Sequence, residues 1–387
     1  MSEWTTCAVS DSFLKIKIGR QNQIPAKNIS PTGRFPVIDQ GQEFISGYCD
    51  DENKVIDFDL PLIIFGDHTR CFKFVDFPFV LGADGTKVLF PNKKLFDPRF
   101  YFFALLALEL PSRGYNRHFK TLKEQRLALP PLPEQKKIAH ILSTVQRAIE
   151  AQERIIQTTT ELKKALMHKL FTEGLRNEPQ KQTEIGLVPE SWDVVELGDM
   201  LTHTQYGMSV KGTPEGYYPI LRMTNQVLGQ IVDRNLQYVE ISDADYAKFK
   251  VERGDILFNR TNSLDLVGRT AIFDIEGDFV FASYLIRLRT DEKQLNSFFL
   301  SCYFNTDEIQ VRLKSIATRA VSQSNISASR LKGFPIPKPS LDEQEEMVTA
   351  SLALDWKLAV HRSKLAQYQD LFGTLLHELM TAKVQVS

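Results

Sequence analysis

Hydrophobic residues recur at helical spacing along two stretches of the chain, each about forty residues long. In the first stretch a heptad pattern runs through positions 138, 145, 152, 159 and 166, with further positions at 141/142, 148/149, 155/156 and 162. Both stretches follow proline-rich segments, ALPPLPEQ at 128–135 and FPIPKPSLDEQ at 334–344, where proline prevents an earlier helix start. We predict two long helices that start near Pro133 and Leu341, the first ending near Gly174 after roughly 60 Å.

The second stretch is a copy of the first at a shift of 209 residues. The segment Leu132-Pro133-Glu134-Gln135 falls on Leu341-Asp342-Glu343-Gln344 without a gap. The pairs that follow are Ile138 with Met347, Val145 with Leu354, Ile149 with Leu358, Ile156 with Leu365, Leu162 with Leu371, Leu166 with Leu375, Leu170 with Leu379 and His168 with His377. An internal repeat of this kind predicts a duplicated architecture.

A heptad pattern requires a helical partner, and the second copy is the obvious candidate for the first. We therefore predict an antiparallel coiled coil. The residues expected at this helix–helix interface are Ile138, Val145, Ile149, Gln152, Ile156, Leu162 and Leu166 of the first helix and Leu354, Leu358, His361, Leu365 and Leu375 of the second. The alternative is that each helix packs only on its neighbouring domain.

Polar residues interrupt both heptad patterns near their midpoints. Gln152 stands in the first pattern, and His361 stands at the equivalent position of the second. The midpoints of an antiparallel pair would meet, so we hypothesise that the two side chains lie close to a pseudo-two-fold axis and fix the register. The alternative is that both side chains point to solvent.

Two globular blocks, one before each helix, also resemble each other. The segment Gly33-Arg34-Phe35-Pro36-Val37-Ile38 parallels Gly216-Tyr217-Tyr218-Pro219-Ile220-Leu221, and an apolar strand that runs into a polar turn occurs at 62–67 and at 254–259. Leu122-Lys123 lies 209 residues before Leu331-Lys332. Strand-like segments such as DILFNR and GRTAIFDI, with a helix expected at 294–305, predict a mixed α/β domain in each block.

The predicted fold class is thus α+β: two mixed α/β domains separated by two long helices that form an antiparallel coiled coil, in a pseudo-two-fold tandem repeat. The expected boundaries are residues 1–130 for the first domain, 131–178 for the first helix, 185–339 for the second domain and 340–387 for the second helix.

Composition and charge narrow the class of protein. The 387 residues include 43% hydrophobic and 25% charged residues, which is typical of a folded protein. We expect a cytoplasmic protein, because the chain has no long apolar run and no secretory signal at its start. Four distant cysteines without metal-ligand spacing are expected to be reduced, structural thiols.

The net charge of −1 disfavours a chain that holds DNA unaided, because neutralisation of phosphates supplies much of such affinity. Residues 1–130 carry 17 Lys and Arg against 15 Asp and Glu, and residues 131–184 carry nine against seven. Residues 185–339 carry 17 against 19, and residues 340–387 carry four against seven. If DNA is the ligand, we expect a partner subunit to supply part of the positive surface.

The chain resembles the specificity subunit of a Type I restriction-modification system. The resemblance rests on residues 129–175, LPPLPEQKKIAHILSTVQRAIEAQERIIQTTTELKKALMHKLFTEGL, and on their degenerate copy at 341–384. Supporting motifs are YPILRMTN at 218–225, GDILFNRTNS at 254–263, SQSNIS at 322–327 and GYNRHFKTLKEQRLALPPLPEQ at 114–135. The first block departs from the family in its strand and turn motifs, and the second helix reads SLDEQEEM in place of PLPEQ.

This resemblance implies two target recognition domains, each of which reads one half of a bipartite double-stranded DNA site, with the helices setting the length of the unread spacer. It also implies partners: two methyltransferase (modification) subunits, which use S-adenosylmethionine, and through them the restriction/translocase subunits, which use ATP and Mg. The specificity subunit itself would have no catalytic residues, cofactor or metal.

The sequence lacks the motifs of the catalytic partners. An (N/D/S)PP(Y/F) loop for a flipped adenine is missing, since Asp97-Pro98-Arg99-Phe100 has no second proline, and no GxxxxGK(S/T) loop for phosphates occurs. Asp355-Trp356-Lys357 resembles part of a nuclease motif but lies on a predicted helix without the upstream strand. A free-standing nuclease and a structural adaptor that binds protein remain the alternatives.

Candidate DNA-binding residues lie on polar turns, because Arg can read guanine and Asn or Gln can read adenine in the major groove. In the second block they are Lys211, Arg222, Asn225, Arg260, Thr261, Asn262, Ser263, Arg319, Ser322, Gln323 and Asn325. In the first block, chosen by position, they are His68, Thr69, Arg70, Arg113, Tyr115, Asn116 and Arg117. The Lys and hydroxyl groups are better suited to phosphates, and each residue could equally be structural.

Overall fold

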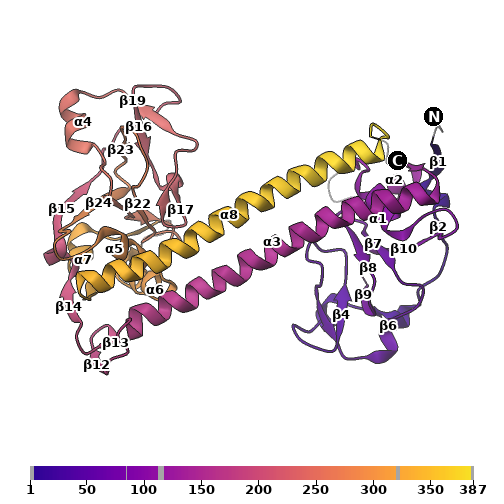
Figure 1. Cartoon of the computed structure of the whole chain (residues 1–387), viewed down its shortest axis with the longest axis horizontal. Helices are drawn as coiled ribbons and strands as arrows, with labels where there is room; N and C mark the ends of the chain where they lie inside the picture. Colours follow the sequence, from indigo (N-terminus) through magenta and orange to yellow (C-terminus); the bar gives the residue numbers. More distant parts are fainter. Residues whose placement is uncertain (1–3, 84, 112–116, 320–322, 385–387) are drawn as a thin grey trace. The chain divides into compact units, whose positions relative to one another are not determined.

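The computed structural model describes residues 4–83, 85–111, 117–319 and 323–384. The chain divides into two compact units (Figure 1). Unit 1 comprises Met1–Arg154 and Arg362–Ser387, and unit 2 comprises Ile155–His361. The long helices α3 (Leu132–Glu173) and α8 (Leu341–Met380) cross the division between the units. Each unit therefore combines one globular block with part of both long helices.

The globular block of unit 1 is built on two sheets, and a third pair of strands links its beginning to its end. An antiparallel sheet has the order β2-β10-β7-β8, and a second sheet has the order β3-β9-β4-β5 with β6 also paired to β9. Strand β1 pairs with β11 immediately before α3. The bounds are β1 Thr5–Ala8, β2 Phe13–Leu14, β3 Gln23–Ile24, β4 Phe35–Ile38, β5 Gly47–Cys49, β6 Val55–Ile56, β7 Leu62–Gly66, β8 Phe72–Val75, β9 Phe79–Gly82, β10 Thr86–Pro91, α1 Pro98–Leu106, α2 Phe119–Glu124 and β11 Arg126–Leu129.

The globular block of unit 2 follows the same plan with additions. A six-stranded sheet has the order β15-β24-β20-β22-β18-β17, a second sheet has the order β19-β16-β23, and β14 pairs with β27 immediately before α8. The bounds are β12 Gln180–Thr183, β13 Gly186–Pro189, β14 Asp193–Glu196, β15 Leu201–Tyr206, β16 Tyr218–Leu221, β17 Gln226–Val227, β18 Gln230–Ile231, β19 Gln237–Val239, α4 Asp243–Phe249, β20 Ile256–Asn259, β21 Thr261–Asn262, β22 Thr270–Ile272, β23 Val280–Phe281, β24 Leu285–Thr290, α5 Ser297–Phe304, α6 Asp307–Ser315, β25 Thr318–Arg319, β26 Ser324–Asn325, α7 Ala328–Lys332 and β27 Pro335–Lys338.

The central strands of the two units are equivalent. Every residue of β7 and of β20 is buried, which explains their uninterrupted apolar sequences. Both strands pair with antiparallel neighbours on each side, β10 and β8 in unit 1 and β24 and β22 in unit 2. The predicted correspondence between the segments at 62–67 and 254–259 is therefore confirmed as a shared strand position.

Buried polar side chains join the start of each long helix to its own globular block. The side chain of Gln135 accepts a hydrogen bond from the backbone N–H of Asp97 (2.8 Å) and donates to the carbonyls of Leu95 and Pro130 (2.9 and 2.8 Å). In unit 2, Gln344 accepts from the N–H of Asn296 (2.8 Å) and donates to two carbonyls. Both glutamines are 0% exposed.

The carbonyls bonded by Gln344 belong to Gln294 and Pro339, at 3.2 and 3.0 Å. The residues whose N–H groups the two glutamines bind, Asp97 and Asn296, are the N-caps of α1 and α5. A preceding glutamate is also used twice, because Glu134 accepts from the indole of Trp4 (3.1 Å) and Glu343 from that of Trp192 (3.0 Å). The Glu-Gln pair of the repeat is thus a structural clamp.

The two long helices pack together inside each unit. In unit 1, Ile138, Ala139 and Leu142 of α3 share a core with Leu379 and Met380 of α8. In unit 2 the core contains α3 residues Met167, Leu170 and Phe171 together with α8 residues Met347 and Val348. The beginning of each helix therefore packs on the end of the other, which confirms the predicted antiparallel pair.

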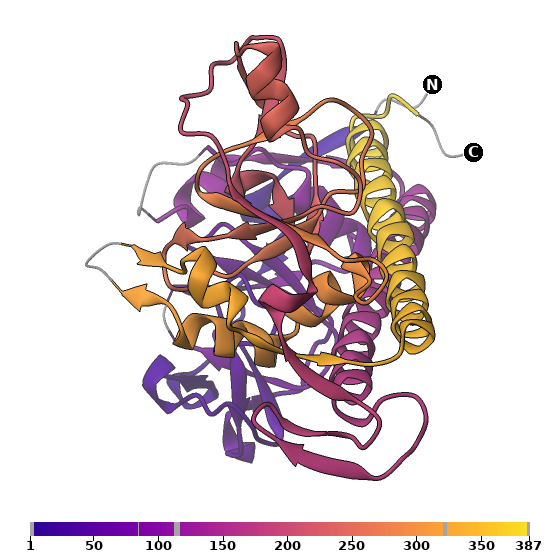
Figure 2. The same cartoon turned by 90° about the vertical axis from the view of Figure 1, so that its left-hand side faces the viewer.

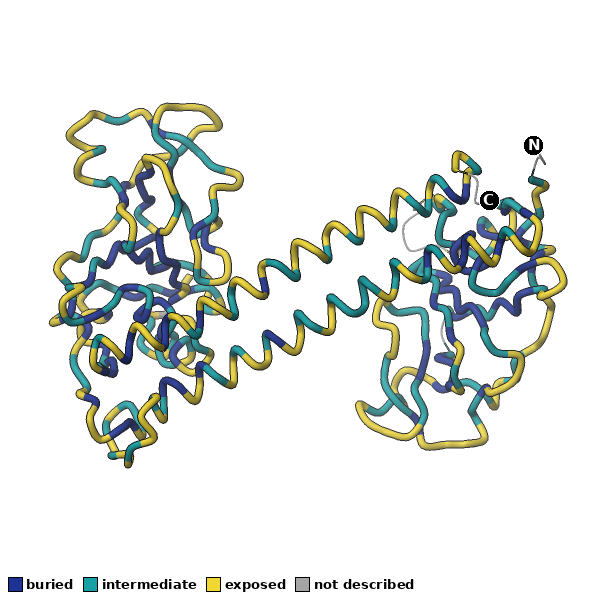
Figure 3. The backbone as a smooth tube through the Cα atoms, viewed as in Figure 1, coloured by how far each residue is buried: buried dark blue, intermediate teal, exposed yellow. Residues whose placement is uncertain are grey.

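The globular blocks also contribute to these cores. Phe103 of α1 packs edge-on against Phe372 of α8, and Phe171 of α3 packs on Phe299 of α5. The two expectations for the helices, pairing with each other and packing on a domain, both hold. Figure 3 shows the consequence: buried residues gather in the strands of each unit, and exposed residues recur along both helices.

One residue expected at the helix–helix interface was assigned wrongly. Leu162 is 54% exposed, and the neighbouring Lys163 instead forms an ion pair with Asp355 of α8 (2.6 Å). The buried positions nearby are Thr159 and Met167. A straight helix drifts by about 20° per heptad against a strict seven-residue repeat, so the buried stripe leaves the heptad positions near the end of α3.

The remaining interface residues keep at least part of their surface covered. Ile138 and Leu358 are buried, and the others are half-buried: Val145, Ile149, Gln152, Ile156, Leu166, Leu354, His361, Leu365 and Leu375. Leu166 and Leu375 pack on the cores of unit 2 and unit 1, respectively. The hypothesis that Gln152 meets His361 stays a prediction, since the two residues belong to different units.

The four cysteines are free, and Cys49 is buried. Burial raises the pKa of the Cys302 thiol, whose Sγ lies 3.4 Å from the hydroxyl of Ser351 on α8. Within the described residues, no helix has the length and apolar character needed to cross a membrane.

Replacing Gln344 with alanine should lower the free energy of unfolding by at least about 3 kcal/mol. The substitution leaves one N–H and two carbonyl groups without their protein partner, and each buried group of this kind costs ~1–3 kcal/mol. Urea denaturation of the full chain measures the change. Glu345→Ala is the matched control, because this exposed neighbour should change stability by less than about 0.5 kcal/mol. Equal effects of the two substitutions would contradict the clamp.

Candidate nucleic-acid interface

In unit 2 the end of a central strand leads into a small polar sheet. Strand β20 is followed by Arg260 and then by β21, which pairs with β26, and β26 pairs with β25. The register places Thr261 opposite Asn325 and Asn262 opposite Ser324. The structure therefore brings together candidates that are about sixty residues apart in the sequence. Figure 2 shows β25 and β26 as an orange hairpin at the edge of unit 2.

The side chain of Arg260 is held by two groups of its own unit. Its guanidinium lies over the ring of Tyr206 (4.6 Å to the centroid), and Nη1 donates to the carbonyl of Ser283 (3.3 Å). The hydroxyl of Tyr206 accepts a hydrogen bond from the N–H of Ala328, at the start of α7. Tyr206 itself is 42% exposed. Stacking and hydrogen bonding fix a planar donor group in one orientation, which favours specific recognition over a mobile charge.

Side chains of β21 and β26 are linked by short polar contacts. The amide of Asn325 donates to the hydroxyl of Thr261 (2.6 Å), and the amide of Asn262 donates to the Sδ atom of Met223 (2.9 Å). Thioether sulfur is a weak acceptor, so the Asn262 amide can exchange this partner for a base edge at little cost. All three polar side chains are half-exposed.

Three of the other candidates in unit 2 have exposed side chains. Lys211, Ser263 and Gln323 are exposed. The backbone of Arg319 belongs to β25, and Ser322 lies outside the described residues. Arg222 is half-exposed, and its Nη2 atom donates to the carbonyl of Asn235 (2.8 Å).

Asn225 is not available to DNA, and its assignment as a base-reading residue is wrong. The side chain is 0% exposed. Its Oδ1 accepts from the N–H of Arg222 (3.0 Å), and its Nδ2 donates to the carbonyls of Val232 and Arg234 (3.2 and 2.9 Å). The sequence motif YPILRMTN identified a residue that closes a turn, because Asn can satisfy backbone groups as readily as it can read adenine.

In unit 1 the equivalent strand end carries the turn His68-Thr69-Arg70. The Thr69 hydroxyl donates to the carbonyl of Gln40 (2.5 Å), and Nη1 of Arg70 donates to the carbonyl of Leu110 (2.8 Å). Arg70 has a φ of +63°, which is uncommon for residues other than glycine. The turn is thus tied to the segment that precedes α2, as the β20 end is tied to β26 in unit 2.

The rest of the first-block candidates divide into two groups. Arg113, Tyr115 and Asn116 lie outside the described residues, and Arg117 is exposed. His68 is half-buried, and its backbone N–H donates to the Oε1 atom of Gln40 (3.3 Å). Sequence reasoning missed Gln40, in the loop after β4, and Tyr206, on β15, which contact these turns. Neither residue lies within a recognisable motif.

Two arginines on β24 are structural and not part of the candidate interface. Arg287 is buried, and its burial lowers the pKa of the guanidinium. Arg289 donates from Nε and Nη2 to the two carboxylate oxygens of Asp255 (2.7 and 2.9 Å), and this hydrogen bonding raises the pKa of Arg289. Because Asp255 is only 1% exposed, it needs these cations as partners.

The residues that resemble catalytic fragments have structural partners. Asp97 caps α1 through its side chain, which accepts from two backbone N–H groups. Asp355 forms the ion pair with Lys163, and a second lysine of α3, Lys164, bonds Asp307 of α6 (3.0 Å). In the part of the chain that the structure describes, no group of three His, Cys, Asp or Glu side chains is placed to hold a metal ion.

The sequence profile of one family, the Type I restriction modification DNA specificity domain, matches residues 1–160 and 189–367. The chain belongs to this family. The two matches correspond to the two globular blocks with their adjoining helix segments, so the internal duplication seen in the sequence is a duplication of the family's domain.

Curated relatives in archaea and bacteria carry corresponding names. The putative type I restriction enzyme MjaX specificity subunit of Methanocaldococcus jannaschii is 35% identical over 203 residues, which are 52% of this chain and 44% of that protein. The MjaVIII specificity subunit of the same organism is 25% identical over 76% of this chain and 72% of its own length. The EcoKI specificity subunit of Escherichia coli is 27% identical over 57% and 49%. The chain thus spans about half the length of most of these relatives.

Solved structures support the same fold. The S subunit of a Type I restriction-modification system from M. genitalium aligns over 98% of this chain and 96% of its own, with a TM-score of 0.64 and 18% identity. A second structure, from work on the assembly and conformational transition of the type I R-M system, aligns over 98% of both chains, with a TM-score of 0.51 and 16% identity. The predicted fold class is confirmed.

Substitution of two asparagines should separate structural from reading roles. Asn225→Ala removes three buried hydrogen bonds and should cost at least about 3 kcal/mol of stability without changing the preferred DNA sequence. Asn262→Ala should leave stability within about 0.5 kcal/mol and reduce discrimination at one base pair, which a good contact supplies at ~1–3 kcal/mol. Thermal melting and binding to a panel of single-base variant duplexes measure the two effects. A change of sequence preference in Asn225→Ala would show that our structural assignment fails.

Proposed function

We propose that the chain is the DNA-recognition subunit of a Type I restriction-modification complex and that it has no catalytic activity of its own. Each unit would read one half of a bipartite site in double-stranded DNA. The observation that carries the proposal is the duplicated strand end: β7 and β20 both lead into polar turns whose side chains bond backbone carbonyls of other segments of the same unit, those of Gln40 and Ser283. A bipartite, asymmetric site is the natural ligand of two similar but non-identical reading units.

In unit 2 the reading group would be Arg260 with the side chains of β21 and β26. A narrow ribbon of strands fits the major groove of B-DNA, where an Arg fork recognises guanine and an Asn amide recognises adenine. Thr261 and Ser263 are better suited to phosphates, which would orient the unit on the duplex. In unit 1 the equivalent group would be His68, Thr69 and Arg70.

The long helices would set the length of the spacer between the half-sites and would provide the surface for two methyltransferase subunits. The exposed positions that recur along α3 and α8 leave room for such partners. Chemistry would reside in the partners: methyl transfer from S-adenosylmethionine in the modification subunits, and ATP- and Mg-dependent translocation and cleavage in the restriction subunits. The chain's net charge of −1 is consistent with a DNA-binding role only if other subunits also neutralise DNA phosphates, and the proposed partners would do so.

Exchange of one globular block tests whether the two units read independently. Residues 185–339 would be replaced with the corresponding block of another specificity subunit, and the chimera would be expressed with its methyltransferase. Single-molecule sequencing of the host genome then maps the methylated adenines. We expect one half-site to change completely and the other to stay the same. If both half-sites change, the units do not read DNA separately, and if no methylated motif exists in the parent, the proposed function fails.

Lengthening both helices tests the role of α3 and α8 in spacing. Four residues would be inserted after Arg154 in α3 and four after His361 in α8, where the units divide, so that the contacts within each unit are kept. The added turn is ~6 Å long, which corresponds to one or two base pairs at ~3.4 Å each. Mapped methylation sites should keep both half-sites and gain one or two spacer base pairs. As a control, both four-residue insertions are placed after the exposed Glu184, in the turn between β12 and β13, and the original spacer should be kept.

A further inference from the structure

The duplicated segments Gly33–Ile38 and Gly216–Leu221 take no part in the recognition turns described above, yet both units build them in the same way. Strand β4 pairs with β5 so that Pro36 lies opposite Tyr48, and β16 pairs with β19 so that Pro219 lies opposite Tyr238. The residue three positions before each glycine also forms an isolated bridge with the same tyrosine, Ser30 with Tyr48 and Thr213 with Tyr238.

The glycine that opens each segment is required by this packing. A Cβ atom on Gly33 would lie 2.9 Å from the Cβ of Tyr48, and one on Gly216 would lie 2.8 Å from the Cβ of Tyr238. Distances of this size are too short for two carbon atoms, so neither position accepts a side chain. Glycine, proline and the facing tyrosine are therefore scaffold residues, and their retention in both units has a steric cause.

One position inside the shared scaffold differs between the units and is exposed in both. The residue after the glycine is Arg34 in unit 1, with 67% of its side chain exposed, and Tyr217 in unit 2, which is 75% exposed. Each rests on the aromatic residue that follows it. The Arg34 guanidinium lies 4.7 Å from the centroid of the Phe35 ring, and the rings of Tyr217 and Tyr218 meet edge-on at 4.7 Å.

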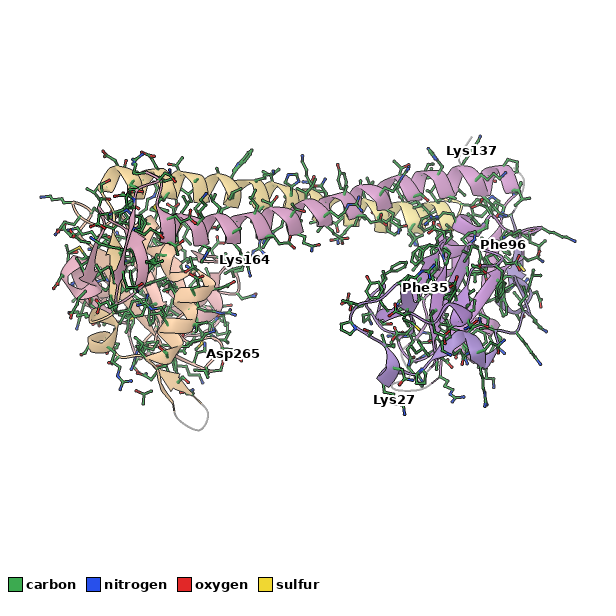
Figure 4. The ribbon with its side chains drawn as sticks, turned by 90° about the horizontal axis from the view of Figure 1, so that it is seen from below. Lys27, Phe35, Phe96, Lys137, Lys164 and Asp265 are labelled. Carbon is green, nitrogen blue, oxygen red and sulfur yellow. The ribbon has the colours of Figure 1, made fainter. Side chains whose placement is uncertain are left out.

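The partners that hold these side chains are weak enough to be exchanged. Arg34 forms an ion pair with Glu52 at 3.5 Å, but both side chains are largely exposed, and such pairs contribute about 0–1 kcal/mol. In unit 1, Figure 4 shows Phe96 near the helices and Phe35, the residue that follows Arg34, farther from them, so β4 lies in the part of the unit away from α3 and α8.

We propose that Arg34 and Tyr217 are equivalent DNA-contacting residues, one in each unit, and that they differ because each contacts its own half-site. Arginine can bond a guanine edge or a phosphate, and tyrosine can bond a phosphate through its hydroxyl or pack its ring on sugar and base. This inference rests on the proposed function and adds a second contact in each unit, on a different sheet from the β7 and β20 turns.

The duplication supplies an internal control for the test. The chain in complex with its methyltransferase subunits would be titrated, at one salt concentration, with three duplexes: the intact bipartite sequence, the same sequence with the unit 1 half-site scrambled, and the same with the unit 2 half-site scrambled. The block exchange described above identifies which half-site belongs to unit 2. Arg34→Ala should weaken binding to the intact duplex about tenfold and have no effect once the unit 1 half-site is scrambled. Tyr217→Ala should show the reverse dependence.

Matched variants separate this result from a general loss of charge or of folding. Arg126→Ala removes another exposed arginine of unit 1, whose guanidinium bonds Thr6 of β1, and should bind every duplex like the parent. Arg34→Lys and Tyr217→Phe identify the group that makes the contact, since a phosphate contact survives the lysine and a stacking contact survives the phenylalanine. Thermal melting checks that all variants are folded.

The possible failures are distinguishable. If the parent complex binds the scrambled and intact duplexes equally, the proposed function fails. If the parent discriminates between them but Arg34→Ala and Tyr217→Ala behave like Arg126→Ala, the proposed function stands and this inference is overturned.

Discussion

The burial of one glutamine amide at the start of each long helix is the constraint on which the rest of the structure depends. Gln135 and Gln344 bond the N-caps of α1 and α5 and two carbonyls each, with no exposed surface. A buried amide with all these groups satisfied has one favourable orientation, because any rotation leaves polar groups unpaired. The direction in which each helix leaves its globular block is therefore determined by side-chain chemistry.

The fixed direction of each helix also fixes where the polar turns of its own block lie relative to that helix. A helix that left its block at a variable angle could not relate one reading surface to another, whatever its length. Packing within each unit also holds the helices in place, since Phe171 of α3 packs on Phe299 of α5 and Phe372 of α8 packs against Phe103 of α1. Each unit is thus a globular block and a helix pair with a common core, and the turns after β7 and β20 are carried by that core.

The duplication also indicates which residues are structural and which are free to change. The glutamines, the Trp and Glu pairs, the glycines and the buried strands occur in both units with the same contacts. The exposed positions between them differ, as with Arg34 and Tyr217. Two copies of a scaffold that bind different DNA sequences are expected to differ at the residues that contact the DNA. They are expected to keep the residues that pack against other parts of the same unit.

The sequence by itself determined the two long helices, their antiparallel pairing, the duplicated α/β blocks and the family, because a heptad pattern and a 209-residue repeat are periodic over many residues. Only the tertiary structure decided which polar residues are accessible. Asn225 and Arg260 both lie on family motifs, yet the first closes a turn with no exposed surface and the second stacks on Tyr206. Leu162 lies outside the helix–helix interface because the buried stripe of a straight helix drifts relative to a strict seven-residue repeat, and this drift accumulates along α3. Burial and hydrogen bonding depend on strands distant in the sequence, and no local pattern records them.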